Sequence, residues 1–192
     1  RFNMKKRMIF FVLFSFIFTA STVSLLKENK NILRPSISRI FDLNSESIDI
    51  LNDGWRSAQL DYIFNGNYRV FGAYGIDDKS SMISFYYYKI FNDFFINTGL
   101  NIEKYSEYEK LYNYGFVGAG LSKSISKGVD LSSQFFYWKV INSDDDANFS
   151  GLVYADVKYP STDFGLQFGI SKNFINSDYW LYLSLSYHYK IN

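Results

Sequence analysis

The chain has 192 residues, of which 47% are hydrophobic and 21% aromatic, and it contains no cysteine. This length suits one domain of ordinary size, and the apolar content excludes an intrinsically disordered chain. The lack of cysteine excludes a disulfide scaffold, a Cys-ligated metal site, a thiol nucleophile and a lipidated N-terminal cysteine. A single histidine, His188, leaves little for acid–base catalysis or a His-rich metal site.

The first residues have the organisation of a secretory signal peptide, which we predict over residues 1–24. Four of the 20 Lys and Arg residues fall within the first seven positions, ahead of an apolar run from Met8 to Phe18 and a series of small residues. As a helix this run is about 16 Å long, too short for the ~30 Å hydrocarbon core of a bilayer. An uncleaved N-terminal membrane anchor is the alternative.

Met4 is the expected natural start, and cleavage near Ser21 or Ser24 is expected to leave residues 25–192 as a single domain. Removal of the basic N-terminal residues leaves more Asp and Glu than Lys and Arg, since the whole chain carries only one more basic residue than acidic ones. This mildly acidic balance gives no reason to expect nucleic-acid binding.

Alternation of apolar and polar residues dominates the rest of the chain. From Tyr179 to Ile191 the odd positions are all apolar or aromatic, whereas the even positions are mixed. A strand with this period turns one face to apolar surroundings and the other to polar ones. About ten such strands are predicted. They are Leu33–Asp42, Trp55–Phe64, Tyr68–Ile76, Met82–Phe91, Phe94–Glu103, Leu111–Ile125, Val129–Ile141, Ser150–Tyr159, Phe164–Lys172 and Tyr179–Ile191. Pro35 interrupts the first strand and favours an edge position for it.

Short turns between these strands predict the pairing register. Across the glycine-containing loop Asn65–Asn67, Tyr62 faces Val70, and Asp61 lies diagonal to Arg69 within reach of a long side chain. The other hairpins can also be paired in a continuous register. The register matters because a shift by one residue would exchange the two faces of a strand.

Three further hairpins follow from the same argument. Ile125 is expected to face Val129 across Ser126–Gly128, Val157 to face Leu166 across Pro160–Asp163, and Phe91 to face Phe94 across Asn92-Asp93. The last pairing puts Lys89 on the apolar face, where its ammonium group must extend to the membrane interface.

Tight and long connections alternate strictly along the chain. The tight ones are Asn65–Asn67, Asn92-Asp93, Ser126–Gly128 and Pro160–Asp163. The longer ones are Leu43–Gly54, Asp77–Ser81, Lys104–Lys110, Asn142–Phe149 and Asn173–Asp178. Tight periplasmic turns, longer outer loops and strands of about ten residues are typical of outer-membrane barrels.

In its alternating strands, in the Tyr and Phe residues at strand ends and in its last strand, the chain resembles the small outer-membrane β-barrel proteins of the OmpA and OmpX type. The resemblance covers nearly all of residues 25–192. It implies an all-β, antiparallel up-and-down transmembrane barrel of about ten strands, or eight as the alternative, in the outer membrane of a diderm bacterium. Such barrels commonly end in an aromatic residue, whereas this chain ends at Asn192 and its nearest aromatic is Tyr189.

The rival architecture is a secreted, lipocalin-like barrel that turns its apolar face inward to bind a ligand. The apolar face holds more large aromatic side chains than a barrel of this diameter encloses, which favours the membrane barrel. The mixed face then lines the lumen. Its predicted charged and titratable residues are Asp61, Arg69, Glu103, Asp130, Asp156, Lys158, His188 and Lys190. Opposite charges on neighbouring strands either pair to brace the wall or line a narrow conduit.

The longer loops are expected to form an acidic, tyrosine-containing surface. Predicted partner contacts are Tyr105, Tyr108, Asp144, Asp145 and Asp146. The acidic run lacks the spaced oxygen ligands of a calcium loop, and a solvated loop tip explains it better. No metal and no cofactor is predicted.

These observations predict an outer-membrane barrel without catalysis, with a structural or adhesin-like, partner-binding role through its outer loops. Outer-membrane lipid and a host or envelope protein are the expected partners. A narrow channel for small solutes is the alternative. A general diffusion pore is not expected, because open aqueous channels need about sixteen strands. An outer-membrane enzyme that modifies lipid A is a further alternative. His188 lies close to Ser186 but at the periplasmic end, away from a surface lipid.

Overall fold

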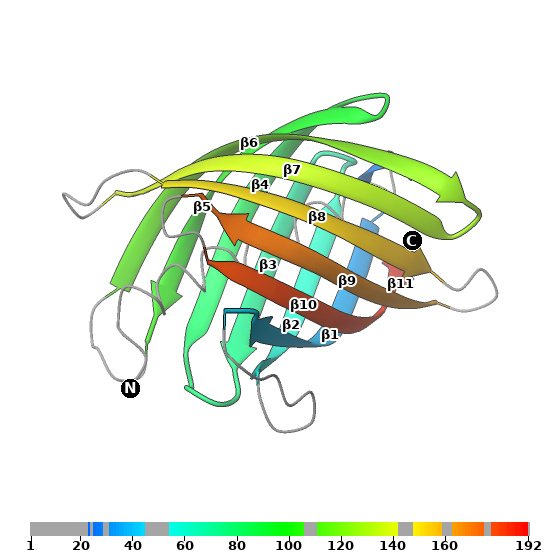
Figure 1. Ribbon diagram of the computed structural model, residues 1–192. Coiled ribbons are helices and arrows are strands. Elements are labelled where there is room, and N and C mark those ends of the chain that lie inside the picture. Colours follow the sequence, from blue (N-terminus) through cyan, green and yellow to red (C-terminus); the bar gives the residue numbers. More distant parts are fainter. Residues whose placement is uncertain are drawn as a thin grey trace.

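The computed structural model shows one antiparallel sheet that closes on itself into a barrel (Figure 1). Each strand pairs with the next along the chain, and the last strand pairs with the first, so the predicted transmembrane β-barrel of ten strands is confirmed. The residues that the structure describes are 23, 25–28, 31–44, 54–105, 111–141, 148–158, 163–174 and 178–191.

The strand boundaries lie within about two residues of those expected from the alternation. The strands are β1 (Asn31–Asp42), β2 (Trp55–Phe64), β3 (Tyr68–Gly75), β4 (Ser81–Phe91), β5 (Phe94–Lys104), β6 (Leu111–Ser126), β7 (Val129–Val140), β8 (Asn148–Lys158), β9 (Phe164–Asn173), β10 (Tyr179–Tyr187) and β11 (Tyr189–Ile191). The tenth predicted strand is thus split into β10 and β11.

The hairpin registers are confirmed, with one local exception. Tyr62 pairs with Val70, Val157 with Leu166 and Phe91 with Phe94. The expected pairing of Ile125 with Val129 is wrong, because Ser126 takes that position. A β-bulge between Ser124 and Ser126 absorbs the extra residue, and every pair beyond it has the expected register.

Pro35 does not lie at an edge, since a closed barrel has none and β1 pairs on both sides. The register sets Pro35 opposite Tyr187. Because proline has no N–H to donate, the ladder between β1 and the last strand is interrupted there. This is the break between β10 and β11, and at this break the N–H of His188 donates to the carbonyl of Asp163 (2.7 Å).

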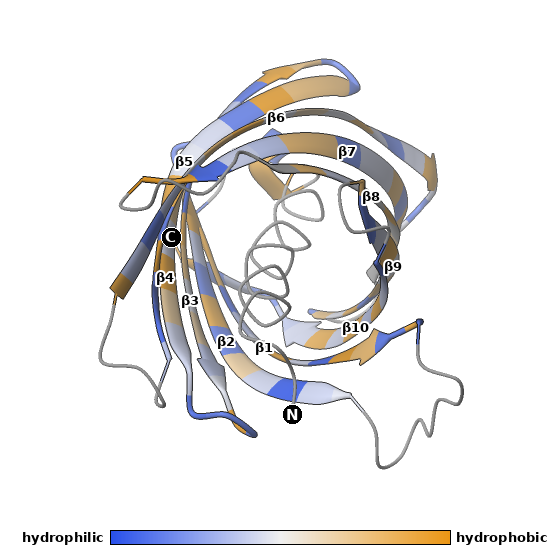
Figure 2. Cartoon of the chain, turned by 60° about the vertical axis from the view of Figure 1, so that its left-hand side comes forward, coloured by the Kyte–Doolittle hydropathy of each residue, from blue (hydrophilic) through white to orange (hydrophobic). Residues whose placement is uncertain are grey.

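The outer wall is apolar. Leu60, Leu100, Phe135 and Val153 are among the large hydrophobic side chains that are exposed, and all stand at outward-facing strand positions. Figure 2 shows apolar and polar residues alternating along the strands of the barrel. An apolar wall of this kind contacts lipid, so the chain spans a membrane, and bacterial barrels of this type lie in the outer membrane. The lipocalin-like alternative is therefore wrong.

The interior is more aromatic than the sequence predicts. Polar residues line β9 and much of β1, β2 and β10, but bulky rings project inward from β3 to β7 and from β10. They include Phe71, Tyr86, Phe116, Phe136, Trp138, Trp180 and Tyr182. Small residues make room for these rings. A Cβ at Gly99 would lie 2.6 Å from the Phe116 ring, which covers this glycine and lies 5.0 Å from the Tyr86 ring.

A helical turn precedes β1, at the barrel end where the tight turns lie. Leu25 and Leu26 are buried, as is Val23, and Lys27 and Glu28 are exposed. Of the predicted signal peptide, residues 1–24, only Val23 is among the described residues. Within the described part of the chain, no helix is long and apolar enough to cross a bilayer.

Candidate functional site

Three charged side chains from adjacent strands meet inside the barrel. Arg34 on β1 is directly opposite Asp61 on β2, and Arg69 on β3 is diagonal to Asp61. Arg34 donates from Nε (3.0 Å) and from Nη2 (2.6 Å) to Asp61 Oδ2, and Arg69 Nε donates to Asp61 Oδ1. Arg34, Asp61 and Arg69, here called the ionic cluster, are 1%, 0% and 1% exposed.

Aromatic rings compensate the excess positive charge of this cluster. The Arg69 guanidinium lies 4.8 Å from the Phe71 ring centroid and 4.9 Å from that of Tyr86. The face of an aromatic ring attracts a cation, most strongly where water is excluded. One carboxylate and two ring faces therefore balance two buried guanidinium groups, and the cluster ties β1, β2 and β3 together.

Sequence reasoning identified Asp61 and Arg69 but missed Arg34. The first two share a hairpin, so their proximity follows from one tight turn. The alternation in β1 could have identified Arg34, because it occupies an even position, like the inward-facing Ser36 and Ser38.

Glu103 is buried near the long-loop end of β5, where it accepts a hydrogen bond from the hydroxyl of Tyr105 (3.1 Å). The assignment of Tyr105 as an outer-loop partner contact is wrong, because its side chain is buried and packs edge-on against Tyr112. Burial and the neighbouring Glu103 carboxylate raise the pKa of Tyr105 well above its usual value. Tyr105 thus belongs to the interior wall rather than to the surface.

His188 and Ser186 are in contact near the tight-turn end. Ser186 Oγ and His188 Nε2 are 3.0 Å apart, and both side chains are buried. The hydroxyl of Ser186 also lies 3.4 Å from the carbonyl of Gly165, where a Cβ would come within 3.0 Å of the imidazole. This site is a buried polar contact at the end of the barrel opposite the long loops.

The other predicted lumen residues lie apart from the ionic cluster. Asp130 is half-buried and accepts a hydrogen bond from Ser124. In the strand register Asp156 pairs with Asp130, and Lys158 pairs with Gly165. The side chains of Asp156 and Lys158 are not among the described ones. The predicted loop contacts Tyr108, Asp144, Asp145 and Asp146 also lie outside the described residues. The prediction that Lys190 lines the lumen is wrong. Its side chain is exposed at the barrel mouth, where its Nζ lies 3.7 Å from Glu28 Oε2.

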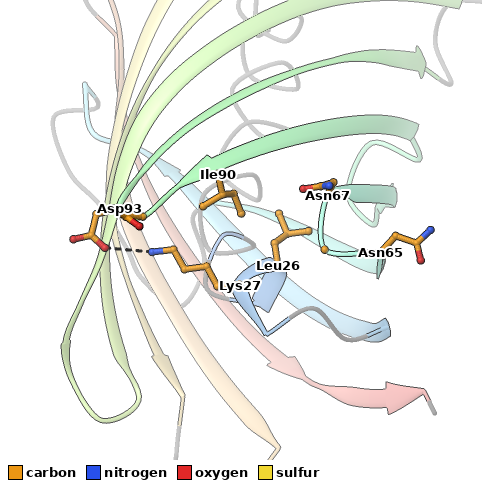
Figure 3. Close-up of a pocket in the computed structure, with 8 residues that line it drawn as sticks. Leu26, Lys27, Asn65, Asn67, Ile90 and Asp93 are labelled. Carbon is orange, nitrogen blue, oxygen red and sulfur yellow. Dashed lines mark hydrogen bonds and ion pairs between the residues drawn. The ribbon is translucent and has the colours of Figure 1, made fainter.

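The segment from Leu25 to Glu28, here called the mouth segment, is tethered on two sides of the tight-turn end. Lys27 Nζ donates to the carbonyl of Ser122 (3.1 Å) and lies 3.4 Å from Asp93 Oδ1 (Figure 3), and Glu28 pairs with Lys190. Leu26 and Lys27 line a pocket of about 550 Å³ together with two tight turns. Its remaining lining residues are Asn65, Gly66, Asn67, Ile90, Asn92 and Asp93. Among the described residues no three His, Asp or Glu side chains gather as metal ligands.

At the opposite end Asp77 binds Arg56, accepting from its backbone N–H (2.8 Å) and from its Nε (3.1 Å). These hydrogen bonds hold the pKa of Asp77 below its ordinary value of 3.8. A lowered pKa contributes stability above the unfolded value, and this contribution is lost as pH falls through the folded pKa.

We therefore expect an NMR titration to place the Asp77 midpoint below that of a carboxylate in an unfolded peptide. In Arg56→Gln the midpoint should rise, because the guanidinium donors are gone. An unchanged midpoint in this variant would contradict the role of Arg56.

Comparison with known proteins shows similarity of fold only. No protein family profile and no curated protein matches the chain. The translocator domain of the autotransporter NalP from Neisseria meningitidis is 10% identical, with coverage of 92% of this chain and 97% of that one and a TM-score of 0.48. An outer membrane channel from Pseudomonas putida F1 is 9% identical, with coverages of 83% and 96% and a TM-score of 0.46. A de novo designed transmembrane β-barrel is 13% identical, with coverages of 82% and 95% and a TM-score of 0.41.

Proposed function

We propose that this outer-membrane barrel is a structural or surface-interaction protein that acts through its long-loop end, without catalysis and without a permanently open pore. The observation that carries the proposal is the packing of the interior. The ionic cluster, the inward rings and the buried part of the mouth segment fill space that a diffusion channel keeps open to water. The long-loop end is then the part of the molecule available to a partner.

Two sets of contacts, one inside the barrel and one at its tight-turn end, support a bracing role for the charges. The hydrogen bonds of the ionic cluster join three neighbouring strands, and the Lys27 and Glu28 contacts tie the mouth segment to opposite sides of the barrel. Removing one partner from a buried ionic group is costly, so the ionic cluster resists the rearrangement that a water-filled conduit requires.

The expected result in planar lipid bilayers is an absence of discrete conductance steps from the purified, folded protein. On intact cells, replacement of Asp144, Asp145 and Asp146 by serine should weaken adhesion to a host cell layer while the amount of folded barrel stays constant. Serine in place of Lys127, at a tight turn, is the matched control and should leave adhesion unchanged. Equal adhesion of the triple variant and the wild type would refute a role for the acidic loop.

A narrow solute channel is the second candidate, and the ionic cluster is the observation that favours it. Two guanidinium groups and one carboxylate inside the barrel would select for small anions. This candidate predicts anion-selective conductance steps in the wild type that lose their selectivity in Arg69→Gln, and such steps would overturn a closed barrel.

A further inference from the structure

The outward-facing charges of the barrel wall are all of one sign. In the described strands every charged residue at an outward-facing position is basic: Arg39, Arg56, Lys89, Lys104, Lys123, Lys139 and Lys172. The strand carboxylates whose side chains are described all stand at inward-facing positions: Asp42, Asp61, Glu103 and Asp130. Solubility alone gives no reason for this separation, since either sign of charge is costly against acyl chains.

Most of these outward cations lie at the long-loop end of the barrel. Lys104 is the last residue of β5, Lys139 and Lys172 are next to last in β7 and β9, and Arg56 is the second residue of β2. Arg39 lies three residues before the end of β1. Only Lys89 and Lys123 lie towards the tight turns. We call the five residues at the long-loop end, Arg39, Arg56, Lys104, Lys139 and Lys172, the outer cationic belt.

Arg39 and Arg56 are directly opposite each other on neighbouring strands. Like charges in this position repel and destabilise the strand pair unless an anion lies close by. Asp77 binds Arg56 and supplies one negative charge, which leaves the group of three with a net positive charge. The other strand neighbour of Arg39 is the apolar Leu183, and the exposed Ile37 lies one outward position deeper. The pair therefore borders the apolar wall.

Aromatic side chains place the belt at the depth of lipid headgroups. Lys172 Nζ lies 4.7 Å from the ring centroid of Tyr179 and 5.9 Å from that of Phe174, and both rings are exposed at the barrel rim. Girdles of aromatic residues mark the membrane interfaces of such barrels, so Lys172 and the belt residues at the same end of the strands meet the layer in which headgroup phosphates lie.

We propose that the outer cationic belt binds the phosphate groups of phosphorylated lipids in the outer leaflet, whose acyl chains lie along the apolar wall below. Guanidinium and ammonium groups form short, charge-assisted hydrogen bonds to phosphate oxygens, and a guanidinium binds two oxygens at once. A headgroup phosphate would add a second negative charge beside Arg39 and Arg56, where Asp77 supplies the first. This binding fixes the depth of the barrel in the membrane and selects the lipids that surround it.

The test compares binding of the full-length protein, held in zwitterionic nanodiscs, to bisphosphorylated lipid A and to the same lipid after removal of its phosphates. The wild type is expected to bind the phosphorylated form about tenfold more tightly or better, since each basic residue near an anionic lipid surface adds to binding. Arg39→Gln/Lys139→Gln/Lys172→Gln should lose this preference. Lys89→Gln/Lys123→Gln, at the tight-turn end, is the matched control and should keep it.

Both variants are first checked for heat-modifiable migration on gels, which reports the folded barrel. Equal binding of the two lipids by the wild type, or equal loss of preference in both variants, would overturn the proposal. Millimolar inorganic phosphate should not compete with the lipid. Full competition by inorganic phosphate would show that the belt binds free phosphate and would equally refute a lipid site.

Discussion

Replacement of Asp61 by asparagine is expected to lower the free energy of unfolding by about 3–5 kcal/mol, the usual cost of removing one partner from a buried ionic group. Asp61 is the only carboxylate that contacts Arg34 and Arg69 in the hydrogen bonds described above. Asparagine keeps the shape of the side chain but not its charge, so two buried cations lose their common counter-ion. Urea unfolding in lipid vesicles, followed by tryptophan fluorescence, measures the change.

Two further variants separate the loss of charge from a general sensitivity of the barrel to substitution. Asp77→Asn removes a carboxylate from an exposed pair and should lower the midpoint of unfolding much less than Asp61→Asn does, since exposed ion pairs contribute little. Arg34→Met/Asp61→Leu/Arg69→Met replaces the whole cluster with apolar groups and should recover most of the lost stability. A midpoint for Asp61→Asn equal to that of the wild type would show that the cluster does not brace the wall.

The sequence predicts the barrel well because its strand signals are local. A period of two fixes which face each residue takes, and a tight turn fixes the register of two strands at once. Tyr62 therefore faces Val70 as expected. The bulge near Ile125 was not predicted, because the pairing of Ser126 with Val129 depends on the backbone geometry of one turn.

Features that depend on closure of the barrel were not predictable in the same way. Pro35 suggests an edge, and only the pairing of β1 with β10 and β11 shows that it interrupts an internal ladder instead. Arg34 reaches Asp61 across a strand pair joined by a long connection, which leaves the register open at the sequence level. Its place in the candidate site therefore required the structure.

The interior and the loops show a second limit. Both faces of β4 carry aromatic residues, so alternation of polarity does not reveal that Tyr86 fills the lumen. In β6 the aromatic residues, Tyr112, Tyr114 and Phe116, all lie on the inward face. Tyr105 follows the last residue of β5 and has the composition of a loop, yet its ring turns inward to Glu103. Whether a residue just beyond a strand end points inward depends on the space that its neighbours leave, and composition does not record that space.

Replacement of Leu100 by arginine is expected to destabilise the membrane-inserted barrel by about 2–4 kcal/mol, the cost of a basic side chain near the bilayer midplane. Leu100 is 50% exposed and stands at an outward position in the middle of β5, far from both rims. From there the guanidinium cannot reach headgroups without disturbing the lipid. Unfolding in vesicles and the yield of folded protein in the outer membrane both measure the effect.

The matched control is Lys89→Arg, which puts the same guanidinium at an outward position near a tight turn. There the Lys89 ammonium already lies 5.5 Å from the ring centroid of Phe91, at a level where a cation reaches the interface. This variant should match the wild type in stability and yield. The depth dependence is the decisive readout, because a barrel with water outside would tolerate arginine at both positions and would gain solubility from Leu100→Arg. Equal stability of the two variants in vesicles would show that the wall of β5 does not face lipid.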